Sequence, residues 1–328
     1  MIRLIFLAVC LFATPASAGV VKAVDLTKRF YQNFETQSLL LEKQAMIDCR
    51  PEALKPAYHS AFDAWVAASA IQFGPIEDIG GPLSIAFWPD KKGFTTKALK
   101  RLIQNNDPII HNPQKFGEVS IAAKGFLAIE RLLFDPAFNE YSEPGTTCAL
   151  ARAISKDIAH KAEYMNTIWQ ASFADVILTA GATDNSKFLS KKEAAQAYLT
   201  SISGALKFIE TARIARPLGT FENPRPKRAE AWRSERPLRN IEVSLKTLQQ
   251  LAMALADGQA PITKDEFSIA LKFLPSITDK SFQSIAETKN RFKVESLLQM
   301  VLSIKEASLE ELSLHLGVTT GFNALDGD

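Results

Sequence analysis

The sequence predicts an all-α protein. Apolar residues recur at helical spacing through several long segments that contain few glycines or prolines. Runs in which β-branched residues alternate with polar residues, the pattern of half-buried strands, are nearly absent. Without an expected leader of 18 residues, about 310 residues remain, enough to bury a large core. We expect them to form two domains or two bundled halves.

In the first half, helix-forming stretches alternate with breaks rich in glycine and proline. Pro51 stands at a favoured first-turn position of its helix. Residues 74–90 contain Gly-Pro and Gly-Gly-Pro breaks, and a loop of this length in a compact domain is more often functional than idle. The helices expected here are residues 21–47, 51–73, 95–103, a segment that ends at residue 134, and 148–178.

Residues 181–186 form a polar linker with turn-forming residues, and we take this linker as the boundary between the halves. The predicted units are an N-terminal bundle, residues 19–182, and a C-terminal bundle, residues 183–328. Gly317 is well placed to end the last helix. The helices expected in this half are residues 191–214, 239–255, 264–274, 280–304 and 308–316.

The first 18 residues have the three parts of a secretory signal peptide. Arg3 supplies the positive charge, and residues 4–13 form an apolar segment too short to span a bilayer. Ala-Ser-Ala at residues 16–18 forms a small-residue cleavage site. We therefore expect export to the periplasm. No later apolar run approaches the roughly 20 residues that a membrane span requires, so we expect no transmembrane segment in the mature chain.

The charge of the chain is nearly balanced. The sequence has 38 Lys and Arg residues against 36 Asp and Glu residues, and the loss of Arg3 with the signal peptide leaves a formal net charge of +1. This balance argues against nucleic acid as the main partner.

Two cysteines remain in the mature chain, Cys49 and Cys148. Because an exported protein meets an oxidising environment, one disulfide between them is expected. Two free thiols are the alternative.

One apolar segment near the middle of the chain carries charge. Residues 122–134 have helical apolar spacing but include Glu130 and Arg131. An unpaired buried carboxylate is costly, so Glu130 is expected to face a cation, a metal or a polar cleft.

Within this segment, residues 125–130 (Gly-Phe-Leu-Ala-Ile-Glu) resemble the G-x-H-x-x-E motif of the imelysin-like family of bacterial envelope proteins. The family is classed as putative metallopeptidases or linked to iron uptake. Leu127 stands where the motif has histidine, and leucine cannot ligate a metal. The resemblance implies that Glu130 is the metal ligand that remains, for a divalent metal or iron.

The resemblance extends over most of the chain and implies two helical bundles packed around a shared cleft, with the Glu130 helix lining it. The blocks that carry it are residues 65–75, 87–90, 216–221 and 321–328.

The four histidines provide no complete metal site. His160 and Glu163, and likewise His59 and Asp63, have spacing that places both side chains on one helix face, but we interpret both as surface pairs. His111 is expected in a loop. No zincin, serine-hydrolase, phosphate-loop or dinucleotide motif occurs in the sequence.

The window between Arg213 and Arg239 is unusually basic, with four prolines. Clustered guanidinium groups suit carboxylates or phosphates through bidentate hydrogen bonds. The alternative, which we favour, is that these cations pair with internal acids and join the two halves. The cations are Arg213, Arg216, Arg225, Lys227, Arg228, Arg233, Arg236 and Arg239, and the acids considered are Glu130, Glu77, Asp78, Asp326 and Asp328.

A cleft in which Glu130 meets Arg216 or Arg225 would be a polar pocket, and Trp65 and Trp88 would give it aromatic walls. Tryptophans in a large helical protein are, however, more often core residues. The ligand-cleft candidates are Glu130, Arg131, Trp65, Trp88, Arg216, Arg225 and Asp326.

Three functions remain open. The first is a periplasmic binding or accessory protein that serves metal acquisition, most often of iron, with a metal, an anionic small ligand or an envelope protein as partner. The second is a metallopeptidase, which needs at least three protein ligands and a free water on the metal, whereas the motif supplies Glu130 alone. The third is a purely structural envelope protein.

Overall fold

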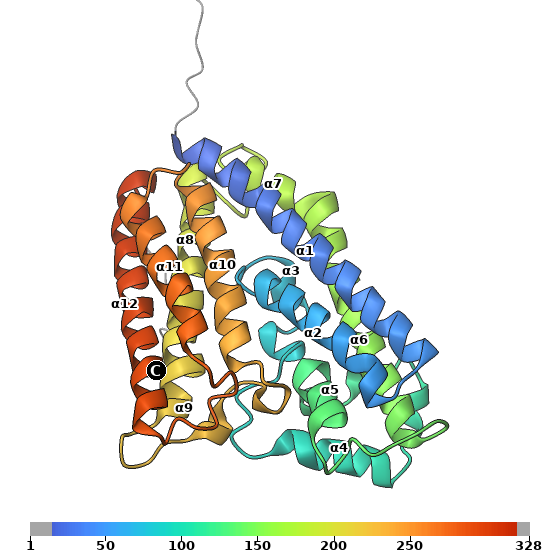
Figure 1. Cartoon of the computed structure of the whole chain (residues 1–328). Coiled ribbons are helices and arrows are strands. Elements are labelled where there is room, and N and C mark those ends of the chain that lie inside the picture. Colours follow the sequence, from blue (N-terminus) through green and yellow to red (C-terminus); the bar gives the residue numbers. More distant parts are fainter. Residues whose placement is uncertain (1–14, 320–328) are drawn as a thin grey trace, which may run out of the picture.

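The structure, a computed structural model, describes residues 15–319 as helices joined by turns and irregular loops (Figure 1). These residues contain no β-strand, which confirms the all-α prediction. Most of the expected signal peptide and all of the C-terminal block with Asp326 lie outside the described residues. The helices are α1 (Pro15–Ile47), α2 (Pro51–Ala68), α3 (Pro75–Asp78), α4 (Phe94–Gln104), α5 (Gly125–Phe134), α6 (Thr146–Ile168), α7 (Ala174–Leu178), α8 (Lys191–Phe208), α9 (Arg216–Leu218), α10 (Pro237–Leu255), α11 (Pro261–Phe273) and α12 (Thr288–Leu316).

The helices pack as two bundles. Helices α1, α2, α5 and α6 pack together in one group, and α8, α10, α11 and α12 pack together in the other (Figure 1). Helix α1 also contacts α8 and α10, so it lies along both groups. Buried apolar residues from both groups form one continuous core. The boundary predicted at residues 181–186 falls in the turn between α7 and α8, and the division into separate domains stays a prediction.

Two π-helical segments extend the helices. Trp169–Phe173 joins α6 to α7, and Ile209–Ala215 joins α8 to α9. A π-helical turn inside an α-helix is often found at a functional site. The second segment leads directly to Arg216, at the start of α9.

The predicted helix ends differ from the structure at several places, and α1 begins at Pro15 instead of residue 21. Helix α2 ends at Ala68 instead of residue 73, because the N–H groups of Ala70 and Ile71 bond to carbonyls three residues back and tighten the last turn. The helices expected at residues 280–304 and 308–316 are one helix, α12. Residues before α12 instead form a turn in which Asp279 accepts hydrogen bonds from Ser281 and Ser284. Gly317 ends α12 at φ 62°, as predicted.

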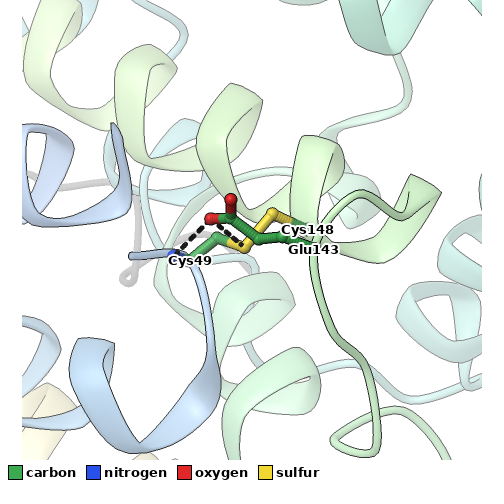
Figure 2. Close-up of side chains that lie close together, drawn as sticks. All are labelled: Cys49, Glu143 and Cys148. Atoms are coloured by element: carbon green, nitrogen blue, oxygen red, sulfur yellow. Dashed lines mark hydrogen bonds between the residues drawn. A yellow bond between two sulfur atoms is a disulfide. The ribbon is translucent and has the colours of Figure 1, made fainter. Parts of the chain in front are cut away.

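The predicted disulfide joins Cys49 and Cys148, 99 residues apart, and both residues are buried. It connects the turn between α1 and α2 to the first turn of α6. The carboxylate of Glu143 lies beside the bridge, 3.2 Å from the Cys49 sulfur (Figure 2). The free-thiol alternative is thereby set aside.

Across residues 15–319, none of the helices is both long enough and apolar enough to cross a membrane.

Candidate functional site

The start of α5 fixes the position of Glu130. Gly125 has φ 71°, a left-handed conformation that glycine adopts readily, and a Cβ here would overlap the carbonyl oxygen of Ile85. The next residue, Phe126, donates its N–H to that same carbonyl at 2.8 Å. The loop at residue 85 is therefore held against the first turn of α5, and the following residues up to Asp90 lie at the same end of the bundle as Glu130.

Glu130 is buried, with 2% of its surface exposed. One oxygen, Oε1, accepts a hydrogen bond from the backbone N–H of Ser234 at 3.0 Å and another from its hydroxyl at 2.8 Å. Burial raises the pKa of Glu130, while the Ser234 hydrogen bonds and the charges of Arg233 and Arg131 act in the opposite direction. Ser234 belongs to a short 3-10 turn, Trp232–Ser234, that precedes α10.

Glu130 lines a cavity of about 520 Å³ between α5, the loop at residues 87–93 with the first turn of α4, and the segment at residues 216–233. The charged side chains around this cavity are mostly positive. Its two acids are Asp90 and Glu130, and Asp90 already accepts hydrogen bonds from the backbone of Phe94 and Thr95. The cations are Lys91, Arg131, Arg216, Lys227, Arg228 and Arg233.

Two of these cations share one acid. Arg233 Nε donates to Asp135 Oδ2 at 2.8 Å, and Arg131 Nε lies 2.8 Å from the same oxygen as an ion pair. Arg131 also donates to the hydroxyl of Thr96 at 2.7 Å. Burial lowers the pKa of Arg131, and the nearby positive charge of Arg233 lowers it further. These two guanidinium groups are therefore held in place at the Glu130 end of the cavity.

The other cations that line the cavity have no acid partner among residues 15–319. In the part of the chain that the structure describes, no side-chain hydrogen bond or ion pair is made by Lys91, Arg216, Lys227 or Arg228. Burial lowers the pKa of Arg216, and the charge of Arg228 lowers it as well. Two guanidinium groups thus repel each other in a partly buried place, an arrangement that an anion between them would relieve.

Of the two aromatic candidates, one lines the cavity and the other lies in the core. Trp88 lines the cavity and packs edge-on against Phe208. Trp65, with 3% of its surface exposed, instead packs against Phe34 in the core of the first bundle and does not line the cavity. Trp232 lines the cavity beneath the guanidinium of Arg233, 4.2 Å from the ring centre.

Of the candidates predicted from the sequence, the structure brings Glu130, Arg131, Trp88 and Arg216 to one cavity. Arg225 is exposed and does not line it. The sequence analysis missed Lys91, Trp232 and Ser234. Lys91 follows the Phe-Trp-Pro-Asp block directly, which was a usable signal, whereas nothing local marks Ser234.

Three further arginines of the basic window, Arg213, Arg236 and Arg239, pair with acids other than Glu130, Glu77 and Asp78, while Asp326 and Asp328 lie outside the described residues. Arg213 donates to Glu230 at 2.7 Å in a buried pair, and Arg236 and Arg239 both bind Asp63. The prediction that Glu77 and Asp78 are the partners was wrong, since Glu77 lies near Lys187 and Asp78 accepts from Tyr164. The basic window therefore does both tasks, because part of it joins the two bundles and part of it lines the cavity.

The family model described as imelysin matches residues 31–308, most of the chain. The chain belongs to the imelysin family.

Two solved structures share the imelysin fold of this chain. An imelysin-like protein from Psychrobacter arcticum has a TM-score of 0.79 and 17% identity, over 96% of this chain and 100% of that chain. A protein described as an iron-regulated protein A precursor, from Parabacteroides distasonis, has a TM-score of 0.73 and 11% identity, over 94% of this chain and 97% of that chain. No curated protein matches the sequence.

In this imelysin-family chain, the residues around Glu130 do not fit a divalent metal. The ion would need at least three ligands, and Leu127, the side chain one turn before Glu130, supplies none. Within residues 18–319, the one group of three metal-ligating side chains close enough to share an ion is Cys49, Glu143 and Cys148, whose sulfurs form the disulfide. A metal at Glu130 therefore stays a prediction.

In this imelysin-family chain, His59 and Asp63 both contact the guanidinium group of Arg236. The Nδ1 atom of His59 lies 3.1 Å from Arg236, which also donates to Asp63 at 2.5 Å. Burial lowers the pKa of His59 to about 4, and the charge of Arg236 lowers it too, so this histidine is neutral at pH 7. His111 and His160 both line a second cavity, of about 980 Å³, beside α6.

Proposed function

We propose that this chain is an exported binding protein that serves metal acquisition, of iron in particular, and that holds its ligand as an anion in the Glu130 cavity. The observation that carries the proposal is a set of cations, Arg216, Lys227 and Arg228, that line a cavity with few acids and have no acid partner among residues 15–319. Guanidinium groups bind carboxylates and phosphates through paired hydrogen bonds.

The positive charge of the cavity also decides the form in which a metal would enter. A bare cation is repelled, because the cavity is lined by six positive side chains and only two acids. An iron ion wrapped by carboxylate groups carries negative charge outward and is attracted. The fold shared with an iron-regulated protein supports the link to iron.

Export is part of the proposal and has its own support in the sequence. The signal-peptide pattern places cleavage after Ala18. N-terminal sequencing of the protein recovered from the periplasmic fraction of expressing cells is expected to begin at Gly19. Recovery of an uncleaved chain from the cytoplasm would contradict this part of the proposal.

Isothermal titration calorimetry of the purified protein with citrate, ferric citrate and pyrophosphate tests the binding function. We expect at least one of these anions to bind, with an affinity that falls as salt is added. Arg228→Ala is expected to weaken binding roughly tenfold or more, the loss of a charge-assisted hydrogen bond. The matched control is Arg225→Ala, which removes an exposed arginine three residues away that does not line the cavity.

Two results would overturn the proposal. One is the absence of binding to all three anions. The other is an equal loss of affinity in Arg228→Ala and Arg225→Ala, which would mean that the cavity has no special part in binding.

A further inference from the structure

The two oxygens of Glu130 are in different situations. Oε1 accepts both hydrogen bonds from Ser234. Oε2 accepts none from any residue in the range 15–319, although Glu130 lines the cavity. Arg131 and Arg233 lie near enough to act through their charge, but neither forms an ion pair with Glu130, because both bind Asp135. One acceptor of this cavity-lining residue is therefore without a donor among the described residues.

An anionic ligand that fills this cavity would leave Oε2 of Glu130 without a hydrogen-bond donor. Its ionised carboxylate or phosphate oxygens suit the cations, but they are acceptors and cannot donate a hydrogen bond to Oε2. A buried acceptor without a donor costs free energy. A ligand that also carries a hydroxyl group supplies this donor, since the hydroxyl donates to Oε2 while the acid groups bind the cations.

We propose that the ligand belongs to the hydroxylated polycarboxylic acids, and that Glu130 recognises the hydroxyl group by accepting its hydrogen bond. This inference rests on the proposed function, of which it names the ligand class. The carboxylates of the ligand lie against Arg216, Lys227 and Arg228 on one side and against Arg131 and Arg233 on the other. A cavity of about 520 Å³ is within the range of small-molecule sites and holds an acid of this size.

A comparison of citrate with tricarballylate, which is citrate without its hydroxyl group, tests the inference. Each of the two acids carries three carboxylates, so both make similar charge interactions with the cations. We expect the purified protein to bind citrate roughly tenfold to a hundredfold more tightly at pH 7.5, as one hydrogen bond to a charged acceptor allows.

Two variants locate the origin of this ratio. Glu130→Gln places an amide N–H near the position of Oε2, and this donor suits a carboxylate oxygen of either acid, so the ratio is expected to fall towards one. Arg228→Ala is the matched control. It is expected to lower the affinity for both acids by a similar factor and to leave the ratio of the two affinities unchanged.

Each other outcome has a definite meaning. Equal binding of the two acids by the unmodified protein overturns the inference and leaves the proposed function standing. A preference for citrate over tricarballylate that persists in Glu130→Gln also overturns it, because another group would then bind the hydroxyl. Binding of pyrophosphate with no binding of citrate overturns the ligand class alone, and binding of none of these anions overturns the proposed function itself.

Discussion

Ser234 donates both its backbone N–H and its hydroxyl to a single oxygen of Glu130. The two residues are 104 positions apart and belong to different bundles, α5 in the first and the turn before α10 in the second. The contact therefore orients the carboxylate of the cavity and joins the two halves at the same point. The burial of this carboxylate, with one oxygen left without a donor, comes at some expense of stability.

That expense gives the first prediction. Burial raises the pKa of Glu130 above the 4.5 of an exposed side chain, so the folded protein binds the proton more tightly than the unfolded chain does. The free energy of unfolding consequently falls as the pH rises through the folded pKa. Glu130→Gln removes this penalty and keeps an acceptor for Ser234. We expect its Tm without ligand to be about 2–4 °C higher at pH 7.5 and unchanged at pH 4.

Thermal unfolding of the two proteins at both pH values checks this prediction. A lower Tm of Glu130→Gln at pH 7.5 would contradict it, because the charged carboxylate would then stabilise the protein.

The second prediction separates ligand-binding arginines from structural ones. Arg228 has no acid partner in the described residues and lowers the pKa of Arg216 by its charge, so Arg228→Ala is expected to keep or raise the Tm of the ligand-free protein. Arg213 is different, because it is buried with Glu230 and also donates to Ser244. Arg213→Ala leaves a buried carboxylate without its cation and is expected to lower the free energy of unfolding by roughly 3 kcal/mol.

Chemical denaturation of both variants measures this contrast. Similar losses of stability in Arg228→Ala and Arg213→Ala would show that Arg228 has a structural partner.

The third prediction concerns the histidine that the family motif has and this chain lacks. Leu127 and Glu130 line the same cavity one helical turn apart, so Leu127→His provides an imidazole beside the carboxylate. We expect no stoichiometric Zn²⁺ binding in Leu127→His, because the new imidazole and Glu130 make two ligands where an ion needs at least three, and six cations line the cavity. Elemental analysis after dialysis against metal-free buffer measures it. Stoichiometric metal in the unmodified protein, lost in Glu130→Gln, would instead establish the metal site predicted at Glu130 without any histidine.

The helices and the disulfide could be predicted because their signals are local or few. Helical spacing marks both ends of α10, the end of α1 and the start of α6 within two residues, and two cysteines allow a single pairing. The cost of burying a carboxylate predicted that Glu130 needs polar partners. It did not predict Ser234, because a serine 104 residues away leaves no mark at the position of Glu130.

The composition of the cavity was harder to predict for a physical reason. Arg225 and Arg228 stand in one basic window, but the 3-10 turn Pro226–Arg228 separates them, and only Arg228 lines the cavity. Trp65 and Trp88 differ in the same way, since Trp65 lies on the core face of α2 and Trp88 on a loop held against α5. Such differences are set by tertiary packing, which residue type and spacing do not record.

The fourth prediction concerns the disulfide. Cys49 and Cys148 close a loop of about one hundred residues, so their bond restricts the unfolded chain strongly. Replacement of both cysteines by alanine is expected to lower the free energy of unfolding by about 2–5 kcal/mol, the usual loss for a native disulfide. Urea denaturation of the double variant and of the reduced protein measures the loss. A stability equal to that of the oxidised protein would show that the packing of α6 against α1 suffices.

The fifth prediction concerns the acid sensitivity of the contact between the bundles. Asp63 on α2 binds Arg236, which has 1% of its surface exposed, and Arg239. Burial alone would raise the pKa of Asp63, but the hydrogen bonds and charges of Arg239 and Arg236 outweigh it and lower the pKa below the 3.8 of an exposed side chain. The folded protein thus holds the carboxylate charged, and the stability that this gives is present above pH 3.8 and is lost as the pH falls through the folded pKa.

Asp63→Asn is expected to remove this acid-dependent part of the stability. It also leaves the buried Arg236 without its acid, although the side chains of Asn240 and His59 still contact that guanidinium. We expect a loss of roughly 3 kcal/mol at pH 7 that shrinks as the pH is lowered towards 2. Urea denaturation at a series of pH values measures both parts. A loss that is the same at every pH would mean that the contact depends on the shape of Asp63 and not on its charge, and Arg239→Ala, which removes the exposed partner alone, is the control with a much smaller expected loss.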